Sequence, residues 1–489
     1  MLKEHEVRMN FEPRVIALFI TSSKILILLL KLCSRHRDAQ MVMKYRDIKA
    51  MIITLKEGEE RKPSQVVKRI VFSRFGIVGT DKDRFLTAIF YGLMRKLGCV
   101  DKVIEGILGE KVEDLDPWLR ASLRLLTYLK VFTYCDRQSM ENLVEYTPKL
   151  LLELTNNRDV VASFNKYCNK IIHANSQDLI NKYVDKDELL YSMPKWLILK
   201  AKELVGGDYE RLLKAMNIKP LISFRVNTLK ATLDDVVEEL ESEGYEVSIG
   251  EHVPIVVKVK PPFKFNESEV FRQGKIVPQD EACAAAALVL DPQPGEVVVD
   301  MCAAPGGKAT HMAELMENEG IIYAFDIHDD RIRRMRYLIR KTGVKNIKIF
   351  KMSCTKAPKV LGEEIADKVL LDPPCSTTGS FAKYPESRWR LTDKTLEEIV
   401  ERQIEFLKTA VRLVKPGGRI LYTVCSILPE EGEEVIKTIL SLYPDHLELV
   451  EIRGFFNEGF MKGTIRSWPH IHNTSGMFFA LLEKVDSLK

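Results

Sequence analysis

Residues 297–308 read VVVDMCAAPGGK, a run of valines that ends in an acidic residue and passes directly into a glycine-containing turn. A short apolar run bounded by a turn indicates a buried β-strand. Gly306 and Gly307 let the backbone approach a ligand closely, and free amides at the start of a following helix can hydrogen-bond that ligand. The stretch therefore predicts a strand, a ligand-binding turn and a helix, in that order.

The strand signature recurs along the rest of the chain, with helical patterns between the strands. It is found at Ile321–Phe325, Ile347–Phe350, Lys368–Leu371 and Arg419–Val424. Short apolar strands that alternate with helices favour a parallel sheet covered on both faces. Ligands of such sheets bind at the carboxyl ends of the strands, near the topological switch point. We therefore predict an α/β, Rossmann-like domain over residues 276–489.

The residues before this domain divide into two further segments. Residues 43–185 show helical periodicity throughout, for example in the apolar stripe of Phe85–Leu97, and predict an all-α domain. Residues 186–275 mix helical patterns with short strands at Ile222–Thr228 and Ile255–Val259, which predicts a small α+β module. This module either connects the two larger domains or contacts the substrate directly.

The first 42 residues need a separate interpretation. Val15–Cys33 is strongly apolar but contains Lys24. A membrane span needs roughly 20 apolar residues and tolerates a central lysine poorly. We favour an accessory helix, or an upstream extension of a chain whose natural start is Met41 or Met43, over a membrane anchor.

The composition limits the class of protein. The chain has 489 residues, 46% hydrophobic and 29% charged, as in soluble globular proteins. The net charge of +4 means that a nucleic-acid surface has to be a local patch. The nine cysteines include no CxxC pair, which argues against structural zinc and a disulfide framework. We therefore expect no metal, free thiols and a reducing, cytoplasmic location.

Two of these cysteines follow predicted strands and carry the chemical argument. Cys375 lies in LDPPCS, residues 371–376, and Cys425 lies in YTVCS, residues 422–426. The turn at 302–308 is neither GxGxxG nor a Walker A loop, and it is of the kind that holds S-adenosylmethionine. A methyl donor beside two thiols favours methyl transfer to carbon, because carbon acceptors usually need covalent activation. We read Cys99, Cys168 and Cys283 as small buried hydrophobes.

Two residues after the next strand are candidates for the cofactor site. Asp326 lies about twenty residues beyond the glycines, where an acidic residue can accept the two hydroxyls of a ribose. The alternative is that Asp326 caps the following helix. Arg331 either supports the cofactor or covers the helix surface.

These motifs together resemble the Sun/RsmB-type RNA (cytosine-5) methyltransferases, from about Pro194 to the end of the chain. The final segment, Trp468–Ala480, is similar to the last hairpin of that family. The run TDKDRF at 80–85, with residues 91–93 and 101–104, resembles the RNA-binding NusB domain. The resemblance implies a Rossmann-like fold that binds S-adenosylmethionine through Cys302, Ala303, Ala304, Pro305, Gly306, Gly307, Lys308, Asp326 and Asp372. Ser353 stands where the family usually has an acidic residue for adenine.

The family resemblance also distributes the catalytic roles. The C5 atom of cytosine is too weakly nucleophilic to be methylated directly, and a thiolate that adds to C6 converts it into an enamine carbon. In DNA cytosine methyltransferases the Pro-Cys cysteine is the nucleophile, whereas in the resembled RNA family the Thr-x-Cys-Ser cysteine attacks. The resemblance therefore implies attack by Cys425 and release by Cys375. Asp372 could hydrogen-bond the N3/N4 edge of the base.

A basic and aromatic loop follows Cys375. Lys383, Arg388, Trp389 and Arg390 interleave cations with an aromatic ring, a composition that can bind phosphates and stack on single-stranded bases. The target base has to leave its stack to reach a thiol. We expect this loop to contact RNA.

The sequence thus predicts a monomeric, S-adenosylmethionine-dependent RNA cytosine-5 methyltransferase. Ribosomal RNA is the first-choice substrate, because the resembled proteins with a NusB domain modify it, and tRNA is the alternative. One rival is an amino-group methyltransferase of the Asp-Pro-Pro-aromatic type. Cys375 argues against it, because a cysteine occupies the position of the aromatic residue. The other is a non-catalytic RNA-binding ribosome-assembly factor, against which the two cysteines and the glycine turn argue.

Overall fold

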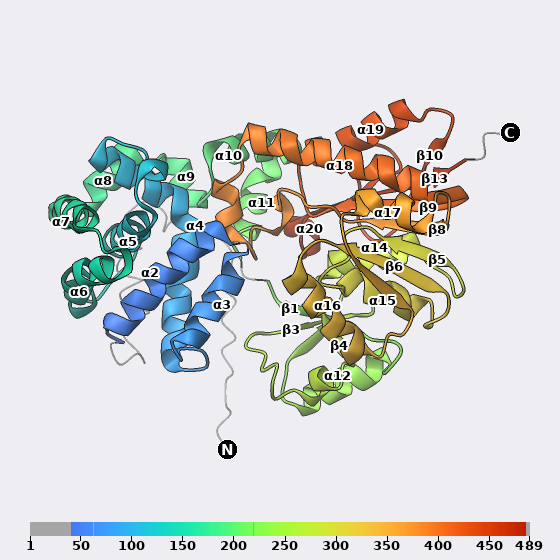
Figure 1. The fold of residues 1–489 in the computed structure, drawn as a ribbon, viewed down its shortest axis with the longest axis horizontal. Coiled ribbons are helices and arrows are strands. Elements are labelled where there is room, and N and C mark those ends of the chain that lie inside the picture. The colour runs from blue at the N-terminus through green and yellow to red at the C-terminus, as the bar shows by residue number, and fades with distance from the viewer. Residues whose placement is uncertain (1–40, 62, 219, 486–489) are drawn as a thin grey trace, which may run out of the picture. The chain divides into compact units, whose positions relative to one another are not determined.

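The computed structural model describes residues 41–61, 63–218 and 220–485 (Figure 1). The predictions made for the apolar segment before Met41 lie outside these residues. The described residues form two compact units, the first within residues 41–90 and 107–176 and the second within residues 91–106 and 177–485. The domain boundaries drawn from the sequence stay a prediction. Among the described residues no helix is both long and apolar enough to cross a bilayer.

The described part of the first unit is built from helices, as the periodicity predicts. Its helices are α2 (Tyr45–Glu60), α3 (Ser64–Arg74), the ends of α4 (Asp81–Leu108), α5 (Pro117–Thr127), α6 (Arg137–Thr155) and α7 (Arg158–His173). Helix α5 shows how these helices begin: Pro117 sets the first turn, and the Asp116 carboxylate accepts from the amides of Trp118 and Leu119. Fully buried side chains such as Ile48, Phe72 and Leu123 form the core.

The second unit begins with short helices and a four-stranded antiparallel sheet. The helices are α8 (Ser176–Tyr183), α9 (Lys186–Tyr191), α10 (Lys195–Val205) and α11 (Tyr209–Ala215). The sheet has the order β2-β3-β1-β4, from β1 (Ile222–Val226), β2 (Val247–Ile249), β3 (Val256–Val259) and β4 (Ile276–Pro278), with α12 (Leu233–Ser242) and α13 (Glu269–Arg272) between them. This is the predicted small module.

A nine-stranded sheet forms the centre of the second unit, with the order β11-β12-β13-β9-β8-β5-β6-β7 and β10 beside β13. Five strands run parallel: β5 (Val297–Asp300), β6 (Ile321–Asp326), β7 (Ile347–Lys351), β8 (Ala366–Leu371) and β9 (Val414–Val424). The antiparallel edge consists of β10 (Leu447–Val450), β11 (Asn457–Glu458), β12 (Ile465–Ser467) and β13 (Met477–Lys484). The α/β, Rossmann-like class predicted from the sequence is confirmed.

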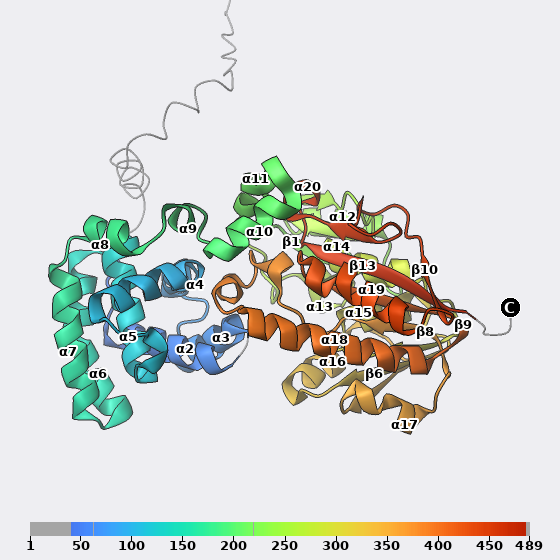
Figure 2. The same ribbon diagram turned by 90° about the horizontal axis from the view of Figure 1, so that it is seen from above.

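Helices cover both faces of this sheet, and the strands supply alternate side chains to each face. Val299, Leu371 and Tyr422 pack in one cluster with α18 (Asp393–Leu413), α19 (Glu433–Leu442) and α17 (Ala357–Leu361), while Val298 and Leu370 pack in another with α14 (Glu281–Leu290) and α15 (Gly307–Leu315). Helix α16 (Asp329–Thr342) follows β6, and α20 (Pro469–His472) lies within the final hairpin. Figure 2 shows α18 and α19 side by side. This alternation follows from the two-residue period of a strand.

The small module is joined to the larger sheet by a buried ion pair. Arg225 of β1 and Glu314 of α15 are both fully buried, and the guanidinium donates to the Glu314 carboxylate. The guanidinium also donates to Gln279 at 2.7 Å and to Thr310 at 3.2 Å. Burial lowers the pKa of Arg225 to about 9. Because α15 begins at the glycine turn, this pair ties the module to the predicted ligand site.

We predict that Arg225→Met in the full-length chain lowers the free energy of unfolding by about 3–5 kcal/mol, because it leaves the Glu314 carboxylate buried without its cation. Urea unfolding of the purified protein, followed by fluorescence, measures the change. The double variant Arg225→Met/Glu314→Leu removes both charges and should recover much of the loss. A single variant that unfolds at the wild-type urea concentration would contradict this role of the pair.

Candidate active site

The motifs singled out in the sequence meet at one edge of the parallel sheet. Strand β5 ends at Asp300, β6 at Asp326 and β9 at Val424, directly before Cys425, while Asp372 follows the end of β8. The chain runs from β5 outward through β6 and β7 and then returns to β8 on the other side of β5. The carboxyl ends of β5 and β8 therefore flank the switch point, where open α/β sheets bind their ligands.

The glycine turn leaves room at the start of α15. Gly306 has a φ of +103°, and a Cβ at this position would come within 2.8 Å of the Met335 side chain. A Cβ on Gly307, the first residue of α15, would meet nothing closer than Gln279 at 3.8 Å. A Cβ there would thus make ordinary contact without a clash, and the first amides of α15 are suited to a carboxylate such as that of the methionyl group of S-adenosylmethionine.

Asp300 adds a buried acceptor beside this turn. Its side chain is 1% exposed, and its Oδ2 has no hydrogen-bond partner among the described residues. Burial, together with the nearby charge of Asp372, raises the pKa of Asp300 to about 7. An unpartnered carboxyl oxygen at a ligand site calls for a donor from the ligand, and the ammonium group of S-adenosylmethionine can provide one.

Asp326 and Arg331 form a bracket around the glycine turn. The Asp326 carboxylate accepts from the His328 amide at 2.9 Å, at the start of α16, and pairs with Arg331 at 3.3 Å. Arg331 also donates to the carbonyl of Ala304. Asp326 thus contacts the start of the following helix, and Arg331 supports the glycine turn through Ala304. Ser353 lies after β7, where its hydroxyl bonds Thr355 at 2.8 Å, and contacts of Asp326 and Ser353 with a ribose or adenine stay predictions.

Lys308 and Asp372 form an ion pair across the switch point. The ammonium donates to the Asp372 carboxylate at 2.5 Å. Burial is the largest single influence on Lys308 and lowers its pKa, but the charges of Asp372 and Cys283 and the hydrogen bond to Asp372 act together with Cys425 to raise the pKa above its ordinary value. The charge of Cys425 acts in the same direction, so the ammonium lies within electrostatic reach of this sulfur. A cation therefore stands at the switch point, paired with Asp372.

The sulfur atoms of Cys375 and Cys425 lie 3.0 Å apart, within hydrogen-bond distance, although the residues are fifty positions apart in the sequence. Both are free thiols. The hydrogen bond to Cys425 and then burial raise the pKa of Cys375 well above its ordinary value, with further contributions from Glu431 and Asp372. Cys375 therefore keeps its proton, and the geometry places it where it can donate to Cys425.

A second pair of cysteines, Cys302 and Cys354, lies in the same region but is not suited to nucleophilic attack. Cys302, in the glycine turn, bonds Cys354, and this bond and burial raise the pKa of Cys302 well above its ordinary value. A thiol with a raised pKa is a poor nucleophile. The described residues hold no group of three or more His, Cys, Asp or Glu side chains able to bind a metal ion.

The basic loop after Cys375 is more deeply embedded than the sequence suggests. Arg388 is fully buried and donates to Ser192, Met216, Asn217 and Phe381. The predicted RNA contact of Arg388 is therefore wrong, because its guanidinium is buried and bonds groups of the protein interior. Trp389 donates to the carbonyl of Arg95 at 2.9 Å, and Lys383 to Asp280 at 2.5 Å. RNA contacts at Lys383, Trp389 and Arg390 stay predictions.

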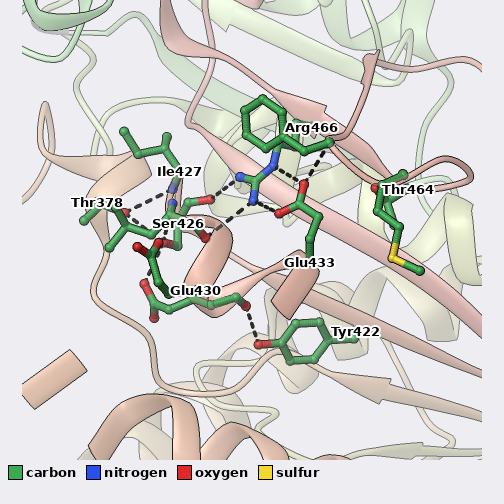
Figure 3. Close-up of polar contacts among 12 residues, drawn as sticks. Thr378, Tyr422, Ser426, Ile427, Glu430, Glu433, Thr464 and Arg466 are labelled. Carbon is green, nitrogen blue, oxygen red and sulfur yellow. Dashed lines mark hydrogen bonds and ion pairs between the residues drawn. The ribbon is translucent and has the colours of Figure 1, made fainter. Parts of the chain in front are cut away.

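Buried polar residues behind the thiols were missed in the sequence. Figure 3 shows the Arg466 guanidinium directed at the Glu433 carboxylate, and Thr378 beside the backbone of Ser426 and Ile427. Glu431 lies in the short turn between β9 and α19. Its carboxylate accepts from the hydroxyls of Ser376 and Ser426, the serines that follow the two cysteines. The only signal in the sequence is the acidic run at 430–434, six residues after the strand end. An acidic run is ordinarily read as an exposed face.

Two family models match the second unit. The model described as 16S rRNA methyltransferase RsmB/F matches residues 287–483, and the model of an RsmF/B-like ferredoxin-like domain matches residues 193–266. The first match spans the large sheet and both cysteines, and the second spans most of the small module.

Individual proteins are similar over longer stretches. The "Probable ribosomal RNA small subunit methyltransferase B" of Bacillus subtilis is 27% identical over 421 residues, 83% of this chain and 91% of its own length. The crystal structure of PH0851 aligns with a TM-score of 0.82 and 42% identity, over 91% of this chain and 100% of that one. A methyltransferase homologue protein from Pyrococcus horikoshii aligns with a TM-score of 0.55 and 30% identity, over 61% of this chain and 97% of that one.

The raised pKa of Asp300 predicts a pH-dependent stability. Between its ordinary value of 3.8 and about 7, Asp300 holds a proton in the folded chain but not in the unfolded chain. Its contribution to the free energy of unfolding therefore falls as the pH rises through this window, by up to about 1.4 kcal/mol per pH unit.

Urea unfolding of the wild type and of Asp300→Asn, at several values between about pH 4 and about pH 8 and without a methyl donor, measures the effect. The amide of the variant cannot titrate, so the wild type should lose stability relative to the variant as the pH rises. Parallel pH profiles would contradict a buried, protonated Asp300.

Proposed function

Because the chain belongs to the Sun/RsmB-type methyltransferase family, we propose that it methylates carbon 5 of a cytosine in RNA, with small-subunit ribosomal RNA as the first candidate. The cofactor of this family of enzymes is S-adenosylmethionine, and the helix start at Gly307 and the unpartnered oxygen of Asp300 fit it. The observation that carries the proposal is the 3.0 Å separation of the Cys375 and Cys425 sulfurs beside that turn. Methylation of an amino nitrogen needs no thiol, whereas carbon methylation uses both.

Cys425 is the proposed nucleophile. Its thiolate adds to C6 of the cytosine, and the electron pair of the C5–C6 double bond moves so that C5 becomes an enamine carbon. A cysteine nucleophile needs a nearby cation, and the Lys308 ammonium, held by Asp372 at 2.5 Å, is the candidate for it. The cofactor supplies the sulfonium methyl group that C5 takes up.

Asp372 is proposed to hold the base. It lies at the switch point between the glycine turn and the cysteines, and its carboxylate is already fixed by Lys308 at 2.5 Å. One carboxylate oxygen can bond the N4 amino group of the cytosine, which orients the ring over Cys425. The ion pair with Lys308 prevents Asp372 from turning away from this position.

Cys375 is proposed to complete the reaction. After methylation, a water molecule takes the C5 proton, and the electron pair of the C5–H bond re-forms the C5–C6 double bond as Cys425 departs from C6 as a thiolate. Cys375 lies 3.0 Å from the sulfur that departs, and its raised pKa makes it the thiol that holds a proton. It can therefore donate a hydrogen bond that stabilises the departing thiolate, while Cys425 cycles between thiolate and thioether.

The choice of RNA rests on the relatives. The Bacillus subtilis protein is a small-subunit ribosomal RNA methyltransferase by name, and it spans 83% of this chain. The NusB-like, RNA-binding role of residues 43–185 stays a prediction that would fit this choice. A tRNA substrate is the alternative, and a comparison of methyl transfer to the two kinds of RNA distinguishes them.

We predict that Cys375→Ala, incubated with RNA and S-adenosylmethionine, accumulates a covalent protein–RNA adduct on a denaturing gel, because attack proceeds and release fails. Cys425→Ala should form no adduct, and the double variant is the control. An adduct with Cys425→Ala alone would reverse the two roles. Absence of an adduct in both single variants, with methyl transfer intact, would contradict the covalent mechanism.

We predict that the protein transfers labelled methyl groups to small-subunit ribosomal RNA that lacks the modification, and at least about tenfold more slowly to tRNA transcripts. Scintillation counting of the purified RNAs measures the transfer. The matched control is small-subunit RNA whose target cytosine has been replaced by uracil. Faster transfer to tRNA would move the assignment to the alternative substrate.

A further inference from the structure

Glu431 is a buried carboxylate that four neutral donors surround. It lies in the short turn η8 (Pro429–Glu431) between β9 and α19 and has no exposed surface. Its Oε1 accepts from the Ser376 amide at 2.8 Å and from Gln403 Nε2 at 3.1 Å. Its Oε2 accepts from the hydroxyl of Ser426 at 2.6 Å and from the hydroxyl of Ser376.

These bonds connect the loops that carry the two thiols. Ser376 directly follows Cys375, and Ser426 directly follows Cys425. The same loops also bond each other directly, through the Gly379 amide and the Cys425 carbonyl at 3.1 Å and through Thr378 Oγ1 and the Ser426 hydroxyl at 2.8 Å. The Glu431 carboxylate therefore bonds both loops, each at the serine next to the cysteine.

The turn that carries Glu431 is itself held in place. The backbone carbonyl of Glu431 accepts from the Tyr422 hydroxyl at 2.7 Å. Tyr422, labelled in Figure 3, is a buried residue of β9. Arg466 pairs with Glu433 at 2.7 Å and donates to the carbonyls of Ser426 at 3.2 Å and Leu428 at 3.4 Å. The carboxylate therefore projects from a rigid support rather than from a loose loop.

We propose that Glu431 is the positioning residue that sets the separation of the two catalytic thiols, by holding the serine next to each of them. The word catalytic rests on the proposed function, but the separation itself is a property of the protein alone. Glu431 bonds the serines and not the sulfurs, so it holds the two loops, while its charge also helps to raise the pKa of Cys375.

The chemistry of the site requires an acid rather than an amide at this position. A carboxylate offers two oxygen atoms, and each accepts from two donors here. A glutamine would turn an NH₂ group toward one of these pairs. If it faced the Ser376 amide and Gln403, donor would meet donor; if it faced the hydroxyls, both serines would have to rotate. Either arrangement loosens at least one loop, and a displacement of about 1 Å at a reacting group can cost on the order of 100-fold in rate.

The first test measures the spacing of the thiols without RNA or methyl donor. Diamide takes two electrons and two protons from a thiol pair and becomes the hydrazine, while the sulfurs form a disulfide. The rate of the Cys375–Cys425 disulfide, followed by peptide mapping after acid quench, should fall about tenfold or more in Glu431→Gln and in Ser426→Ala. Glu430→Gln is the matched control, because Glu430 pairs with Lys200 at 2.7 Å. It should oxidise like the wild type.

The second test measures methyl transfer by the same variants. Glu431→Gln should lose about 100-fold in kcat, while the KM values for RNA and S-adenosylmethionine change less than about threefold. Oxidation and turnover at wild-type rates in Glu431→Gln would overturn the proposal, and so would a loss that only follows the unfolded fraction in a melting curve. If Glu431→Gln does not fold, Ser376→Ala and Ser426→Ala decide the matter, since each removes one hydroxyl. A wild type without methyl transfer would refute the proposed function, while the oxidation rates still decide the role of Glu431.

Discussion

Two thiols that act on one base have to reach the same point from different parts of the chain, and the register of two adjacent parallel strands meets this requirement. Leu371 of β8 lies opposite Tyr422 of β9, and β8 ends shortly before Cys375 while β9 ends directly before Cys425. Parallel neighbours end at the same sheet edge, so the fold brings both loops together. The final 3.0 Å separation of the sulfurs depends on the loops, whose bonds converge on Glu431.

Burying so many charges around one reaction centre would be costly if they were unpaired, and the structure pairs most of them. Lys308 is matched by Asp372, Arg466 by Glu433 and Arg225 by Glu314. Such pairs contribute little net stability compared with apolar packing, but removing one partner is costly, so they specify one arrangement. Asp300 differs, since burial raises its pKa and one of its oxygens lacks a partner within the described part of the chain. Such a group at the switch point is best explained by a ligand.

The strands and the glycine turn could be predicted because short apolar runs and glycines are local signals. The observed β5 and β6 match the predicted strands to within a residue, whereas β9 begins at Val414, five residues before the prediction, where Pro416 and two glycines conceal it. Arg388 was misplaced because a basic, aromatic loop has the same composition whether it faces RNA or the interior. Glu431 could not be found, because its partners Ser376 and Gln403 lie 55 and 28 residues away and meet it only in the folded chain.

The most direct test of the account is the identity of the methylated nucleoside. RNA that lacks the modification is incubated with the wild type and S-adenosylmethionine labelled in the methyl group, digested to nucleosides and analysed by liquid chromatography and mass spectrometry. We predict that the wild type places the label in 5-methylcytidine and that the Cys425→Ala variant places no label. Label in N4-methylcytidine, or in any other nucleoside, retained after Cys425→Ala would contradict the two-thiol mechanism.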